Sequence, residues 1–359
     1  MHLLDTTTGR FRDINSSLDE PYAILSHVWS LVPDYETSYQ RLQAVQSDCE
    51  GTGKNVLLDS RVSDKIRLAC FVAHQDGYRS LWVDSCCINK ESSAELSEAI
   101  NSMFEWYANA SICYVFLDDV EDNEPPRSSG LNDRQIHHQA DGDDSASHPD
   151  DDGASHPDDD SSSDAVGDKP LHPSITGDDD ASQLVDSTSP RPVGDGSASL
   201  DRDLILRERF LSSRWHTRGW TLQELIAPRT VIFLSSGWNL LGSKLTLAKL
   251  IEQATGVDRD ILTHTKSSSD VSVAQRMWWA SGRKTTRLED EAYCLMGLFG
   301  VNLPTIYGEG RRAFIRLQEE IYRTIPDQSI FAWELSEHGS LKRSQLGTTC
   351  DQGVLEVLV

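Results

Sequence analysis

Residues with chemically useful side chains follow two short apolar runs of the sequence. Ser26 and His27 end the run YAILSH, and Asp84 comes directly after Leu81–Val83. A carboxylate such as Asp84 could hold sugar hydroxyls or cap the next turn, and an imidazole such as His27 could contact phosphate or satisfy a loop. Trp29 offers a ring face for a planar base, or else a core side chain. For each of these residues both interpretations stay open.

A second group of candidates lies in the stretch SRWHTRGWTLQEL, residues 213–225. Arg214 and Arg218 carry guanidinium groups that suit a pyrophosphate, and surface ion pairs are the alternative. Glu224 lies near the start of a short helical pattern, either as a functional carboxylate or as an exposed residue favoured by the helix dipole. Trp220 shares the helical face of Glu224 and is expected to pack and fix the helix.

Seven cysteines occur, and none of them forms a CxxC pair. This unpatterned set favours reduced thiols and a cytoplasmic location. Cys86 and Cys87, together with His27, raise the hypothesis of a thiol hydrolase. Burial at the end of a strand is the favoured interpretation of both cysteines.

Strands and helices must alternate to position these residues. Apolar runs predict strands at residues 22–26, 81–83, 112–117 and 230–234. Helical spacing predicts a helix over residues 62–76 and another after a capping box formed by Ser92 and Glu95. The alternation predicts an α/β fold with a parallel sheet covered on both faces. Because ligands bind at the carboxyl ends of parallel strands, the candidate loops should meet there.

The later part of the chain has helical patterns. The expected helices cover residues 245–254, 271–282, 287–299 and 309–323. They predict a helical C-terminal portion packed on the sheet. The segment 220–226 is expected to be helical as well.

The net charge of −24 is unevenly distributed. Residues 121–203 hold 22 acidic and 5 basic side chains, contain no aromatic residue and repeat the heptapeptide ASHPDDD. We therefore predict a disordered acidic insertion. The predicted organisation has a first part at 1–120, this insertion at 121–203, a second part at 204–335 and a polar tail at 336–359. The sequence has no basic cluster for nucleic acid and no apolar run for a membrane span.

Four segments together resemble the heterokaryon-incompatibility (HET) domain of filamentous fungi. They are YAILSHVW at 22–29 and the longer segments 81–117, 213–228 and 273–321. One departure is His216, where the family usually has an aromatic residue. The resemblance implies an incompatibility reaction that ends in programmed cell death and is related to innate immunity, with an incompatibility partner protein.

The HET domain in turn resembles TIR domains, with RGWTLQEL similar to the TIR signature that contains a glutamate. This resemblance implies a TIR-like (flavodoxin-like) parallel sheet and an NAD glycohydrolase activated by homo-oligomerisation. Carried over to this sequence, the catalytic residue is Glu224. NAD is then the substrate, with no prosthetic group and no metal. The alternatives are a non-catalytic TIR-like adaptor module and a hydrolase that uses Cys87.

Cleavage of the nicotinamide–ribose bond has an oxocarbenium-like transition state. Nicotinamide leaves as a neutral molecule, so one carboxylate beside the ribose can suffice. The residues expected to bind the dinucleotide are Ser26, His27, Trp29, Asp84, Arg214, Arg218 and Trp220.

Overall fold

The structure is a computed structural model, and it describes residues 1–30, 36–122, 124–125, 127, 196–335 and 341–343. Most of the predicted acidic insertion and most of the predicted polar tail lie outside these residues. One helix, α4 (Gly196–Ser212), begins inside the stretch that the sequence assigned to the insertion.

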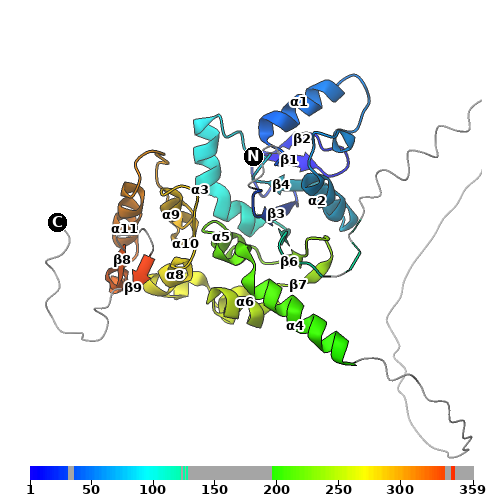
Figure 1. Cartoon of the computed structure of the whole chain (residues 1–359). Coiled ribbons are helices and arrows are strands. Elements are labelled where there is room, and N and C mark those ends of the chain that lie inside the picture. Colours follow the sequence, from blue (N-terminus) through cyan, green and yellow to red (C-terminus); the bar gives the residue numbers. More distant parts are fainter. Residues whose placement is uncertain (31–35, 123, 126, 128–195, 336–340, 344–359) are drawn as a thin grey trace, which may run out of the picture.

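A seven-stranded sheet forms the centre of the molecule, in the order β2-β1-β4-β3-β5-β6-β7 (Figure 1). Strands β3, β4, β5 and β6 run parallel to one another, whereas β1, β2 and β7 pair antiparallel. The strands are β1 (His2–Asp5), β2 (Phe11–Asp13), β3 (Ala23–His27), β4 (Ser80–Val83), β5 (Ile112–Phe116), β6 (Val231–Leu234) and β7 (Leu240–Ser243).

The four parallel strands confirm the four predicted strands and the α/β fold. Counted along the chain, they have the spatial order 2-1-3-4, with which the flavodoxin-like doubly wound sheet begins. The TIR-like part of the expectation stays a prediction. The sheet is mixed, because three antiparallel strands extend the parallel core at both edges. Two of them, β2 and β7, are short and mostly half-buried or exposed, so they lack the apolar runs that mark the central strands.

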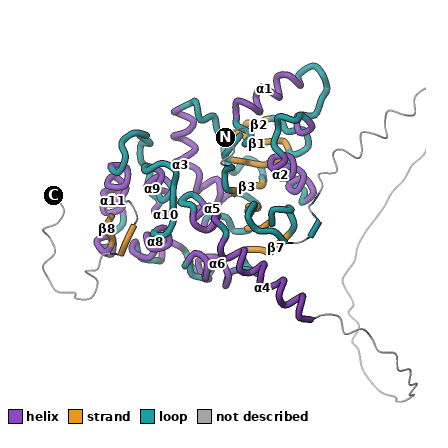
Figure 2. Tube along the Cα trace, viewed as in Figure 1, coloured by secondary structure: helices purple, strands orange, loops and turns teal. Residues whose placement is uncertain are grey.

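Helices cover both faces of the sheet. Helix α2 lies on one side, and α3 and α5 lie on the other (Figures 1 and 2). The bounds are α1 (Tyr39–Cys49), α2 (Asp64–Gln75), α3 (Ser93–Asn109) and α5 (Thr221–Ile226). At the start of α3 only half of the expected capping box forms. The Ser92 side chain accepts from the backbone N–H of Glu95, but the Glu95 carboxylate accepts from the backbone N–H of Asn89.

The last part of the chain is helical, as the sequence predicted. The helices are α6 (Ala248–Thr255), α7 (Arg259–Leu262), α8 (Val273–Ala280), α9 (Asp290–Tyr293), α10 (Met296–Phe299) and α11 (Arg312–Thr324). The single helix expected over 287–299 is two short helices. Helix α10 meets α3 so closely that a Cβ at Gly297 would lie 2.1 Å from the Cβ of Phe104. A short strand pair, β8 (Trp333–Leu335) with β9 (Leu341–Arg343), follows.

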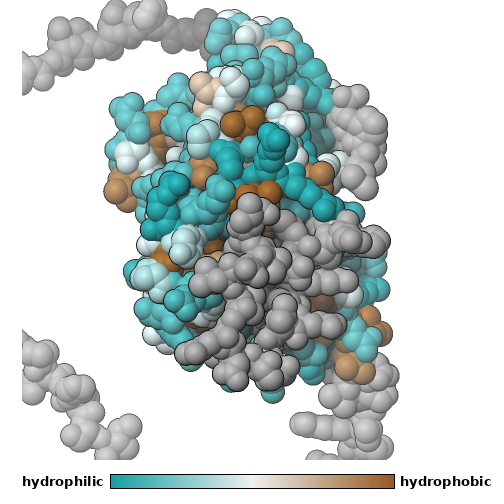
Figure 3. Space-filling view, turned by 90° about the vertical axis from the view of Figure 1, so that its left-hand side faces the viewer, coloured by the Kyte–Doolittle hydropathy of each residue, from teal (hydrophilic) through white to brown (hydrophobic). Residues whose placement is uncertain are grey.

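The face of the molecule that carries these helices is mostly polar. Figure 3 shows apolar residues there as separate small patches among polar ones, where grey atoms do not cover the surface. Ile315 and Tyr322 of α11 are among the exposed apolar side chains. Scattered exposure of this kind is normal for a folded protein. Within the described part of the chain, no helix is both long and apolar enough to cross a membrane.

Candidate functional site

Glu224 is buried on α5, at the carboxyl edge of the parallel strands. The hydroxyl of Ser26, next to last in β3, donates a hydrogen bond to Oε2 of Glu224. The indole N–H of Trp215 in turn donates to the Ser26 hydroxyl at 2.7 Å, and Tyr107 of α3 hydrogen-bonds to the same carboxyl group. Ser26 and Tyr107 therefore orient this carboxyl group directly, and Trp215 orients the Ser26 hydroxyl.

The surroundings of Glu224 make its ionisation costly. Burial raises its pKa to about 7, and the negative charge of Asp84 adds to the rise. The hydrogen bonds from Ser26 and Tyr107 and the positive charge of Arg218 act in the opposite direction. A carboxyl group that titrates near neutrality can exchange a proton at working pH. Such a group at the switch point of an open sheet is a candidate catalytic residue.

A second polar cluster surrounds Asp84, which follows β4. Its Oδ1 accepts from Nε2 of His27 at 3.0 Å, and its Oδ2 accepts from the indole N–H of Trp29 at 2.8 Å. Burial acts to raise the pKa of Asp84, but the hydrogen bond from His27 and the positive charges of Lys90 and Arg218 hold it well below its usual range. Asp84 is therefore a carboxylate at neutral pH.

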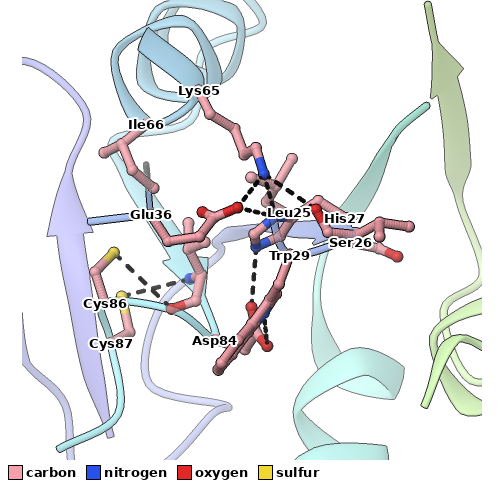
Figure 4. Close-up of polar contacts among 12 residues, drawn as sticks. Leu25, Ser26, His27, Trp29, Glu36, Lys65, Ile66, Asp84, Cys86 and Cys87 are labelled. Atoms are coloured by element: carbon pink, nitrogen blue, oxygen red, sulfur yellow. Dashed lines mark hydrogen bonds and ion pairs between the residues drawn. The ribbon is translucent and has the colours of Figure 1, made fainter. Parts of the chain in front are cut away.

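Lys65 supports this cluster from α2. Figure 4 shows its side chain reaching from the helix toward Glu36 and His27. The ammonium group donates to Glu36 at 2.5 Å, to Nδ1 of His27 at 3.0 Å and to the carbonyl of Val28 at 3.1 Å. Because Nδ1 of His27 accepts from Lys65, the ring proton must reside on Nε2, which donates it to Asp84. The chain of contacts from Glu36 to Asp84 thus assigns the tautomer of His27.

The face of Trp29 is covered by a cation. The ammonium of Lys90 lies 3.5 Å from the centre of the Trp29 ring, a distance typical of a cation–π contact. Burial lowers the pKa of Lys90, while the negative charge of Asp84 opposes that change. Trp29 is half-buried and hydrogen-bonded to Asp84, so it lies beside this cluster rather than in the core.

The structure separates the two arginines that the sequence grouped together. Arg214 pairs with the carboxylate of Asp118 and is 48% exposed, which matches the surface ion-pair alternative. Arg218 is half-buried, and its guanidinium has no hydrogen-bond or ion-pair partner among the described residues. Arg218 acts electrostatically on both Asp84 and Glu224. Of the two, only Arg218 belongs to the cluster.

Trp220 has the packing role that the sequence favoured. It is half-buried against the core, and its side chain hydrogen-bonds to Asp290 of α9. The hydroxyl of Tyr307 also donates to Asp290, at 2.9 Å. Trp220 therefore joins the start of α5 to the C-terminal helices.

The two neighbouring cysteines do not form a thiol site with His27. Both ring nitrogens of His27 are bonded to other residues, and Cys86 and Cys87 are buried against backbone of β4. Burial raises the pKa of the Cys86 thiol, which suppresses the reactive thiolate. In the described part of the chain, no three His, Cys, Asp or Glu side chains are grouped so as to hold a metal ion.

Comparison with known proteins now gives the family. Residues 22–224, more than half of the chain, match the family described as Heterokaryon incompatibility protein (HET). The chain belongs to the HET family. The HET match begins at the residue before β3 and ends at Glu224, so it contains Ser26, Asp84 and Glu224. A further match, to a domain of unknown function (DUF8212), covers residues 312–356.

A curated relative agrees with this assignment. The chain is 35% identical over 313 residues to the vegetative incompatibility protein HET-E-1 of Podospora anserina. The alignment covers 86% of this chain but 17% of that protein, so the chain spans only a small part of the relative's length. No solved structure gives a significant match to the chain.

Proposed function

We propose that this HET chain is an effector of fungal incompatibility that cleaves NAD, with Glu224 as the catalytic carboxylate and with homo-oligomerisation as the activating step. A cytoplasmic location and an incompatibility partner protein belong to the same proposal. The observation that supports it most is the placement of Glu224. This residue is buried, is oriented by Ser26 at the carboxyl edge of the sheet, and lies within electrostatic reach of Asp84 and Arg218.

The reaction fits the properties of one carboxylate. The bond between ribose C1′ and the pyridinium nitrogen breaks, and its electron pair neutralises the departing nicotinamide. An ionised Glu224 beside C1′ stabilises the oxocarbenium character that develops on the ribose. Water then adds to C1′ and loses a proton, which Glu224 can accept because its pKa is about 7. The products are ADP-ribose, nicotinamide and a proton.

The neighbouring residues suit the rest of a dinucleotide. Each oxygen of Asp84 accepts one hydrogen bond from the protein and keeps a further acceptor position for a ribose hydroxyl. Arg218 offers a guanidinium that no described residue pairs, which suits a pyrophosphate oxygen. The Lys90 ammonium covers one face of the Trp29 ring, so a nicotinamide ring would stack on the opposite face or displace Lys90.

The test is NAD consumption by the purified full chain at high concentration and after chemical clustering. We expect turnover that rises with clustering and falls roughly 10²–10⁴-fold in Glu224→Gln and Glu224→Ala. Glu319→Gln, at an exposed position on α11, is the matched control and should keep full activity. Turnover that survives both Glu224 variants would remove this residue from the mechanism. No turnover even in clustered protein would indicate a non-catalytic interaction module.

The two arginines give an independent test of substrate binding. Arg218→Gln should raise KM for NAD about 10-fold, the effect of losing one charge-assisted contact. Arg214→Gln removes the same charge four residues away, where the side chain is already paired with Asp118. Its KM should stay at the wild-type value. Equal effects of the two substitutions would contradict the assignment of Arg218 to the pyrophosphate.

A further inference from the structure

Arg283 reaches the start of the Glu224 helix from the segment between α8 and α9. Its Nη1 donates to the carbonyl of Arg218 and to the hydroxyl of Thr221, both at 3.0 Å, and its Nε donates to the carbonyl of Trp279 at 3.1 Å. Thr221 is the first residue of α5, and its own hydroxyl donates to the carbonyl of Trp215 at 2.6 Å. One guanidinium therefore ties the first turn of α5 to the C-terminal helices.

The same guanidinium places a buried positive charge near Glu224. Burial lowers the pKa of Arg283 to about 10, while the negative charge of Glu224 opposes that change, so the group stays charged at neutral pH. Its Nη2 is buried and has no hydrogen-bond partner among the described residues. Arg283 is half-buried as a residue, and holding a cation with an unused buried donor there costs free energy that an apolar side chain would not.

Other charged and titratable groups face Glu224 from every element packed around it. They are Ser26 of β3, Asp84 after β4, Tyr107 of α3, Cys113 of β5 and Arg218 before α5. Among the described residues, the cations near α5 are Arg218, Arg283 and Lys244, and Lys244 donates to the carbonyls of Leu225 and Pro228 at the other end of the helix. In the proposed function Arg218 pairs with the pyrophosphate of the bound substrate, which neutralises its effect on the carboxylate. Arg283 is then the cation whose charge remains available to Glu224.

We propose that Arg283 is a positioning residue for Glu224, which fixes the first turn of α5 and keeps the carboxylate ionised while substrate is bound. The C-terminal helical portion is therefore part of the site. The consequence for catalysis rests on the proposed function. The effect of Arg283 on the position and ionisation of Glu224 does not, because it can be measured without substrate.

The experiment follows the titration of Glu224 in the full chain by the ¹³C NMR signal of its carboxyl carbon, assigned as the signal lost in Glu224→Gln. Arg283→Gln removes the charge, and we expect the midpoint to rise by a fraction of a pH unit, less than in Arg218→Gln. Arg283→Lys keeps the charge, and the midpoint should stay near that of the wild type. A merely structural role would disturb both variants alike.

The matched control is Arg276→Gln. Arg276 is a buried arginine of α8 that donates to the carbonyl of Leu298 and lies over the ring of Phe299. Its loss should destabilise the C-terminal helices without moving the midpoint of Glu224. The inference would be overturned if Glu224 titrated with the same midpoint in Arg283→Gln and Arg276→Gln. It would also be overturned if Arg283→Lys shifted the midpoint as much as Arg283→Gln does.

Activity separates this inference from the proposed function. If NAD turnover exists, its acid limb should move upward with the NMR midpoint in Arg283→Gln. A moved midpoint in a protein that never consumes NAD would leave the positioning role standing and reject the enzyme. If NAD turnover depends on Glu224 but Arg283→Gln leaves the midpoint of Glu224 unchanged, the positioning role is rejected and the proposed enzyme activity stands.

Discussion

The two polar clusters that flank the end of β3 differ in the charge around their carboxyl groups. Ser26 and His27 are neighbours in one strand, so their side chains point to opposite faces of the sheet. On the Ser26 side, a neutral hydroxyl donates to a buried Glu224, the cations Arg218 and Arg283 form no ion pair with it, and its pKa rises to about 7. On the His27 side, Asp84 has cations near it, and its pKa is lowered.

This difference assigns separate tasks to the two carboxyl groups. Pairs of titratable groups whose environments push their pKa values apart are typical of sites that need one proton-exchanging group and one permanent charge. In these terms Glu224 is the group that exchanges a proton near neutrality, and Asp84 is the permanent anion. Each charge also affects the other, because the carboxylate of Asp84 raises the pKa of Glu224.

The largest expected effect is on the cationic side. Lys65→Met should lower the free energy of unfolding by about 3–5 kcal/mol, because it leaves Glu36 as an unpaired carboxylate that is 16% exposed. Denaturant unfolding at pH 7 measures the change. The double variant Lys65→Met with Glu36→Gln should recover part of the loss, since no unpaired charge is then buried. A double variant as unstable as the single one would show that packing of Lys65, and not its charge, stabilises this cluster.

On the neutral side, a substitution should stabilise the protein. The folded pKa of Glu224 lies above its ordinary value of 4.5, so the folded protein loses stability as pH rises from about 4.5 through about 7. Glu224→Gln removes that loss. The variant should gain about 3 kcal/mol over the wild type at pH 8 and nothing below pH 4. Unfolding curves across this range test the sign, and a difference that does not depend on pH would contradict the raised pKa.

The coupling between the two clusters should be smaller. Asp84→Asn removes the negative charge that raises the pKa of Glu224, so the midpoint of Glu224 should fall by about one pH unit. The carboxyl ¹³C signal of Glu224 reports it. His27→Gln leaves the charge of Asp84 in place and serves as the control. If both variants move the midpoint equally, the two clusters are coupled through structure rather than through charge.

The smallest effect is expected outside both clusters. Arg214→Gln breaks the exposed pair with Asp118, and exposed pairs stabilise proteins by less than about 1 kcal/mol. Thermal unfolding at low and high salt measures it. A larger loss would mean that the segment before α5 depends on this pair.

Much of this arrangement could be predicted from local sequence. The four central strands are continuous apolar runs, and Ser26, Asp84 and Glu224 stand at or beside the ends of such elements. Edge strands lack this signal, because half their side chains face water. The break between α9 and α10 has no sequence signal either, because the apolar pattern continues across it. Tertiary packing on α3 decides where the helix ends.

The residues that support the two clusters, Lys65 and Arg283, have weaker sequence signals. Lys65 had a usable signal, because it lies on the apolar face of its helix, one turn before Ala69, where a lysine is rarely buried without a partner. Arg283 had none. Its partners lie at Arg218 and Thr221, and no local pattern connects them across the chain. Likewise, nothing in the spacing of Arg214 and Arg218 could show that one is paired and the other is not.

The parallel pairing of β5 with β6 has a consequence for the order of folding. It joins Cys113 to Val231, and the whole crossover that carries Glu224 lies between them. Closing so long a loop is slow, although each doubling of its length costs only about 0.6 kcal/mol. We therefore expect β3, β4 and β5 to assemble early and β6 to dock late. Because Glu224 lies in that crossover, a partly folded chain emerging from the ribosome would carry Asp84 in place before Glu224 reaches it.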